Sequence, residues 1–109
     1  MTSIEQRIKE AIEPIINIVV PEVYEGDKTE YVVFNYDEIP AVIADGKPDC
    51  MRLNVQVHYY LPRKISPKVK NKLIYRALLD AGFSAPSIVN AGDYQSQHYV
   101  FEFEALGDA

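Results

Sequence analysis

The sequence contains one cysteine, no tryptophan, five glycines and no long hydrophobic run. Cys50 has no partner for an intramolecular disulfide, and small domains of oxidising compartments usually carry several, so a reduced compartment is expected. The longest apolar run, residues 15–20, is interrupted by Asn17 and is far shorter than the roughly 20 residues of a membrane-spanning helix. The amino terminus lacks the basic segment and apolar core of a secretory signal. We therefore expect a cytoplasmic protein without membrane contact.

Residue patterns for catalysis are also missing. The glycines are scattered one per turn, so no glycine-rich loop cradles a phosphate. His58 and His98 are the two histidines, and no HExxH or CxxC spacing accompanies them. Cys50 follows Asp49, whose charge opposes formation of a thiolate. We expect no enzymatic activity, no cofactor and no metal site.

The patterns that are present predict one α+β domain spanning residues 1–109. Ser3 and Gln6 form a capping box before an amphipathic helix that should end near Glu13, because Pro14 lacks an amide donor. Residues 16–20 could then adopt an extended conformation, and residues 22–29 are predicted to form a loop. Residues 31–36 are β-branched and aromatic, which favours a strand. Residues 41–48 hold either a short strand or a loop.

A second helix is the best-defined element of the sequence. Ser66 and Pro67 predict its start, and Gly82 predicts a left-handed end that lets Phe83 fold back on Leu78. Lys68, Lys72, Tyr75 and Arg76 are expected at its rim. Its expected core stripe is Val69, Leu73, Ile74, Ala77, Leu78 and Ala81.

Alternating segments predict the rest of the sheet. Residues 51–60 and 97–106 alternate apolar and polar side chains, which is typical of antiparallel strands with one face buried. Residues 87–89 can pair with the second segment across the turn at Gly92. The predicted fold is an antiparallel or mixed sheet of about four to five strands with two helices packed on one face.

The charges are sorted along the chain although the net charge is only −5. Residues 1–50 carry eleven acids and four bases, residues 51–82 seven bases and one acid, and residues 83–109 four acids. The basic segment 63–76 is most simply an exposed helix face, but it could also bind nucleic acid or an acidic protein surface. Opposed acidic and basic faces could likewise orient copies of the chain in a ring.

Eight tyrosines are the other unusual feature. About half should pack around the core, whereas outward ones are typical of protein interfaces. Stacking of single-stranded nucleic acid is an alternative, but Arg52 is the one base expected on the sheet, and the acidic blocks would repel phosphate. The tyrosines expected at loop or outward positions are Tyr24, Tyr36, Tyr60, Tyr75 and Tyr94.

The order of short motifs resembles the tail-terminator or tail-completion proteins of long-tailed bacteriophages and prophages over nearly the full length. The motifs are Tyr24-x-Gly26, Tyr31-Val32-x-Phe34-Asn35-Tyr36, Ala44-Asp45-Gly46, Val55-x-Val57-x-x-Tyr60, Ala81-Gly82-Phe83, Tyr94 and His98-Tyr99-x-Phe101-x-Phe103. The resemblance implies a structural virion protein that forms a ring, typically a hexamer, on the end of the tail tube. Its partners would be itself, the major tail tube protein and the head-tail connector protein, in the host cytoplasm during assembly and then in the virion tail.

Three alternatives stay open: a head-closure or neck protein of the same particle, a nucleic-acid-binding module that uses residues 63–76, and a small-ligand domain of ferredoxin-like shape. The loops at 22–29 and 46–48 are candidates to order on contact with the tube. The family offers no fixed functional motif, so the candidate interface residues rest on side-chain type and expected exposure. They are Tyr24, Tyr36, Lys47, Arg52, His58, Tyr60, Arg63, Lys64, Lys68, Lys72, Tyr75, Arg76 and Tyr94.

Overall fold

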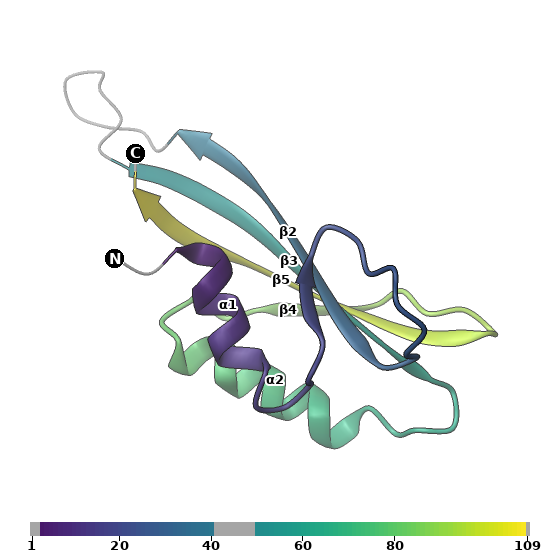
Figure 1. The fold of residues 1–109 in the computed structure, drawn as a ribbon. Helices are drawn as coiled ribbons and strands as arrows, with labels where there is room; N and C mark the ends of the chain where they lie inside the picture. The colour runs from purple at the N-terminus through teal and green to yellow at the C-terminus, as the bar shows by residue number, and fades with distance from the viewer. Residues whose placement is uncertain (1–2, 41–49, 109) are drawn as a thin grey trace.

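A computed structural model describes residues 3–40 and 50–108 as a mixed five-stranded sheet with two helices on one of its faces (Figure 1). The sheet order is β1-β2-β3-β5-β4, in which β1 and β2 are parallel and every other pair is antiparallel. This is the α+β arrangement that the sequence predicts. The elements are α1 (Ile4–Ile12), β1 (Val19–Pro21), β2 (Tyr31–Pro40), β3 (Cys50–Pro62), α2 (Lys68–Asp80), β4 (Ser87–Asn90) and β5 (Ser96–Asp108).

Helix α1 forms as its capping residues require. The Ser3 hydroxyl accepts a hydrogen bond from the Gln6 amide at 3.1 Å, and the helix ends at Ile12 with Glu13 as its C-cap, just before the proline. Ile8 and Ile12 lie one turn apart and are fully buried. Among the described residues, no helix is long and apolar enough to cross a membrane.

Helix α2 also ends as predicted. Gly82 has a φ of +91°, and the Phe83 amide donates to the Leu78 carbonyl at 3.3 Å, which closes the left-handed cap. At the other end the Ser66 hydroxyl accepts from the Lys68 amide at 3.4 Å. Pro67 is the N-cap and not the first helical residue, a shift of one position from the prediction.

The predicted core stripe of α2 is partly wrong. Ile74 and Leu78 are fully buried, whereas Val69 is 69% exposed and Leu73 is 48% exposed. A helix turns about 100° per residue, so Leu73 lies about 100° around the axis from Ile74. The helix meets the sheet and α1 along the narrower stripe centred on Ile74 and Leu78. Tyr75, expected at the rim, instead packs against the core from beside Ile74.

The core lies between the helices and the inward face of the sheet. Phe34, Val57 and Phe101 are register partners across three strands and are all fully buried. Strand β2 continues to Pro40, which places Tyr36 on the same inward face as Phe34, where it packs against the core. The expectation that Tyr36 points outward is therefore wrong.

The two edge strands are short. The expected extended segment before the first loop forms β1 beside β2, and the expected pairing of residues 87–89 forms β4 beside β5. The loop at 22–29 is confirmed as irregular. Residues 41–49, including Lys47, lie outside the described residues.

Candidate functional site

The helices leave the opposite face of the sheet uncovered within the described residues (Figure 1). We call this surface the open face. Its residues follow from the strand registers and alternate with the buried ones. They are Val20, Tyr31, Val33, Asn35, Asp37, Arg52, Asn54, Gln56, His58, Tyr60, Ser87, Val89, His98, Val100, Glu102 and Glu104.

One end of the open face carries a continuous stack of rings, which we call the aromatic ladder. The ring centroids of Tyr24 and Tyr31 are 4.5 Å apart, and those of Tyr31 and Tyr60 are 4.8 Å apart. The Tyr60 ring then stacks on His98 at 4.1 Å, and His98 lies 5.0 Å from His58. Tyr31, Tyr60 and His98 occupy one register row across β2, β3 and β5, which explains why their rings meet.

The two histidines are hydrogen-bonded to each other, with His58 Nδ1 2.8 Å from His98 Nε2. The Gln56 Oε1 atom lies 3.2 Å from His58 Nε2 and can only accept, so that nitrogen carries the hydrogen. In neutral His58, Nδ1 is then the acceptor and His98 Nε2–H donates.

Burial lowers the pKa of both histidines. For His58 the charge of Glu102 acts in the opposite direction, and for His98 the neighbouring His58 lowers the pKa further. Protonation of both rings would set two N–H groups against each other. The doubly protonated state of the pair is therefore disfavoured.

The other end of the open face is polar and acidic. Asp37, Glu102 and Glu104 project there, and Arg52 forms an exposed ion pair with Glu104 at 3.8 Å. A hollow of about 400 Å³ lies over this half, lined by Asn35, Asp37, Asn54, Val55, Gln56, Ser87, Glu102, Phe103 and Glu104. We call it the acidic half.

The outward side of α2 has the opposite charge. Lys68, Lys72 and Arg76 are exposed on it, beside the exposed Val69 and Leu73. We call this surface the outer face of α2. It points away from the sheet, so it lies on the opposite side of the molecule from the open face (Figure 1).

Lys70 belongs to the basic segment but is not available to a partner. Its Nζ donates to both carboxylate oxygens of Glu30, at 2.9 and 3.0 Å, and the Tyr59 hydroxyl donates to the same carboxylate at 2.7 Å. Burial alone would raise the pKa of Glu30, but these hydrogen bonds and the Lys70 charge outweigh it and hold that pKa below its ordinary value. Burial, together with Glu30, raises the pKa of the Tyr59 hydroxyl.

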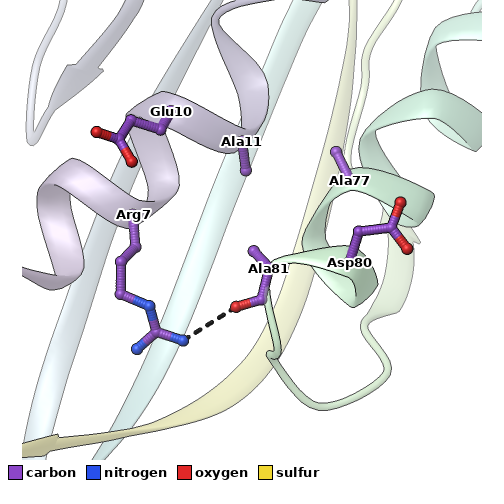
Figure 2. A pocket seen from close by; sticks show the side chains of 6 residues that line it. All are labelled: Arg7, Glu10, Ala11, Ala77, Asp80 and Ala81. Carbon is purple, nitrogen blue, oxygen red and sulfur yellow. Dashed lines mark hydrogen bonds between the residues drawn. The ribbon is translucent and has the colours of Figure 1, made fainter. Parts of the chain in front are cut away.

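A second hollow, of about 440 Å³, lies between the two helices (Figure 2). Its main polar feature is Arg7, which donates to the carbonyl of Ala81 at 3.2 Å and lies 4.5 Å above the Phe83 ring. A cation at the carboxyl end of a helix stabilises it, so Arg7 joins α1 to the end of α2. Glu10 and Asp80 flank the opening (Figure 2). The arrangement is that of a structural contact.

The structure brings some of the predicted interface residues together. Tyr24, Tyr60 and His58 meet in the aromatic ladder, Arg52 lies in the acidic half, and Lys68, Lys72 and Arg76 share the outer face of α2.

Other predicted residues lie apart from these surfaces. Tyr94 is 86% exposed in the turn before β5, where the Arg63 guanidinium donates to the Asp93 carbonyl. Lys64 is exposed in the turn before α2.

Sequence reasoning missed several members of these surfaces. Tyr31 and His98 complete the ladder, and Val69 and Leu73 belong to the outer face of α2, although the sequence assigns both to the core. The register that aligns Tyr31, Tyr60 and His98 is not encoded in any one segment. Among the described residues, no three His, Cys, Asp or Glu side chains are grouped to hold a metal ion.

Comparison with known proteins adds no assignment. No protein-family model matches the chain, and no curated protein shows significant sequence similarity to it.

Proposed function

We propose that this protein is a structural subunit that forms a ring at the end of a bacteriophage tail tube. There it would stop polymerisation of the tube protein and present a surface to the head-tail connector. The resemblance in motif order supports this proposal. One structural observation carries it: a small domain bears two separate surfaces of opposite charge, the acidic half of the open face and the outer face of α2.

Two unlike surfaces on opposite sides of a subunit favour head-to-tail association. Such contacts are heterologous and close into a ring when the rotation between neighbours divides a full turn. A single contact repeated around the ring uses both surfaces of every copy. This contact leaves the two rims of the ring free, so the tube protein can bind one rim and the connector the other.

Light scattering coupled to size-exclusion chromatography tests the proposal. We expect a concentration-dependent species approaching about 74 kDa, which is six times the 12.4 kDa of one chain, and binding to purified tail tubes. A protein that stays monomeric at high concentration and also fails to bind tail tubes would overturn the proposal. Pull-down with tube protein and, separately, with connector protein distinguishes a tail terminator from a neck protein, since a neck protein would retain only the connector.

The exposed bases of α2 favour one second candidate, binding to nucleic acid. Lys64, Lys68, Lys72 and Arg76 could contact phosphates, and such binding would weaken steeply as salt is raised. A titration against single- and double-stranded DNA and RNA at 50 and 200 mM salt checks this. Absent or salt-independent binding would remove the candidate.

A further inference from the structure

We propose that the outer face of α2 of one copy docks on the acidic half of the open face of the next copy. This proposal rests on the proposed self-association and specifies the contact that would produce it. The occupant is a second copy of the chain because each surface supplies the charge that the other lacks, and because one molecule carries both.

The outer face of α2 has the composition of a docking helix. At about 100° per residue, Lys72, Arg76, Val69 and Leu73 follow one another around about 100° of the helix surface. This sector lies opposite the buried stripe of Ile74. Val69 and Leu73 form an i, i+4 apolar pair along one side of this sector, with 69% and 48% of their surface in solvent, so a partner could bury them. An apolar pair next to cationic side chains is typical of an interface, where apolar side chains are buried and charged ones stay at the rim.

The acidic half provides the matching groups. Glu102 and Glu104 are exposed on β5, and Asp37 is exposed on β2. Val89 on β4 is 48% exposed beside them and supplies apolar surface. Arg52 offsets one of the three acidic charges. The hollow of about 400 Å³ over this half gives the helix a concave seat.

The spacing of the charges is compatible on the two sides. Glu102 and Glu104 are two residues apart on one strand, a separation of about 7 Å. Lys72 and Arg76 are one helical turn apart, a rise of about 6 Å. A helix lying nearly along β5 can therefore set both bases opposite both acids. Because the two surfaces lie on opposite sides of the monomer, they can be paired only between copies.

Reciprocal charge reversal tests this contact. Variant K72E/R76E reverses the helix side, and variant E102K/E104K reverses the sheet side. Each alone should weaken self-association by about tenfold or more, because like charges then face each other across the interface. An equimolar mixture should restore the mass of the wild-type assembly, since reversed bases meet reversed acids and the remaining contacts are wild type.

Matched controls separate this effect from net charge. Variant E13K/E25K makes the same charge change as the sheet variant at exposed positions outside both surfaces, and variant K28E/K64E does so for the helix variant. Both should assemble like the wild type. Thermal denaturation should show that every variant is folded, since exposed charges such as Glu104 contribute little to stability. Variant V69S/L73S should also weaken association, without changing its dependence on salt.

The outcomes distinguish the two proposals. A wild-type chain that stays monomeric at high concentration and also fails to bind tail tubes overturns both the ring and this contact. If the wild type assembles and the reversed variants assemble equally well, this contact is overturned and the proposed ring remains. Pairing through the edge of β4 would then be the contact to test. Weakening in the single variants without recovery in the mixture also overturns the contact. Recovery in the mixture, with unaffected controls, supports it.

Discussion

The Glu30 carboxylate joins the start of β2, the carboxyl-terminal part of β3 and α2, and its removal gives a defined loss of stability. The Tyr59 hydroxyl is buried and donates to Glu30 at 2.7 Å, whereas the Lys70 side chain that also contacts it is 36% exposed. In the variant Glu30→Ala the Tyr59 hydroxyl loses this acceptor. An unsatisfied buried hydroxyl costs about 1–3 kcal/mol, and the partly exposed ion pair with Lys70 adds about 0–1 kcal/mol.

We therefore expect Glu30→Ala to lower the free energy of unfolding by about 2–3 kcal/mol. For a domain of this size that loss corresponds to a fall in Tm of about 10–20 °C. Urea denaturation followed by circular dichroism at pH 7 measures it. Two controls bracket the result: Tyr59→Phe, which removes donor and desolvation together and should cost about 1 kcal/mol, and Glu25→Ala, at an exposed position, which should cost almost nothing.

The pH dependence gives an independent check on the same group. The pKa of Glu30 is lower in the folded chain than its ordinary value of 4.5, so the unfolded state binds the proton more readily. Its stabilisation is therefore fully present above about pH 4.5 and is lost as the pH falls through the folded pKa. The difference between wild type and Glu30→Ala should shrink below that pH. A loss under about 0.5 kcal/mol at pH 7, or one that does not shrink in acid, would refute this reasoning.

Two further predictions concern other parts of the fold. Gly82→Ala should lower the free energy of unfolding by about 1–2 kcal/mol in urea denaturation, because φ is +91° there and the backbone would be strained. Crowding is not responsible, since the nearest atom to a new Cβ, on Arg7, is 3.8 Å away. An unchanged denaturation midpoint would contradict the left-handed cap. The stability of the wild type should decline as the pH falls below about 6.5, because the folded histidines bind protons less readily than the unfolded ones. The double variant His58→Gln with His98→Gln should show a flatter dependence of stability on pH between pH 7.5 and 5.5. Equal slopes for the two proteins would mean that burial does not lower the pKa of the histidine pair.

The features that short segments specify were predictable from the sequence. The Ser3 cap, the end of α2 at Gly82 and the alternation of β3 and β5 each depend on residues a few positions apart, and all three are confirmed. Local side-chain chemistry and periodicity are sufficient for such elements. They also gave the α+β class and the side of the sheet on which the helices lie.

The features that depend on tertiary contacts were not predictable. Leu73 has the spacing of a core residue, and only the orientation of α2 against α1 and the sheet turns it outward. In the sequence Lys70 cannot be told from its exposed lysine neighbours, although its Nζ donates to the carboxylate of Glu30, forty positions away. The meeting of Tyr60 with His98 depends on the β3–β5 register, which no single segment encodes.

The aromatic ladder makes part of the open face rigid before any partner arrives. Stacking between Tyr31, Tyr60 and His98 restricts the rotamers of all three side chains in the monomer. Immobilising a flexible side chain on association costs about 0.5–1.5 kcal/mol each, and here that cost is largely met during folding. Tyr24 extends the same order into the loop between β1 and β2. A surface prepared in this way would change shape little on contact with a partner.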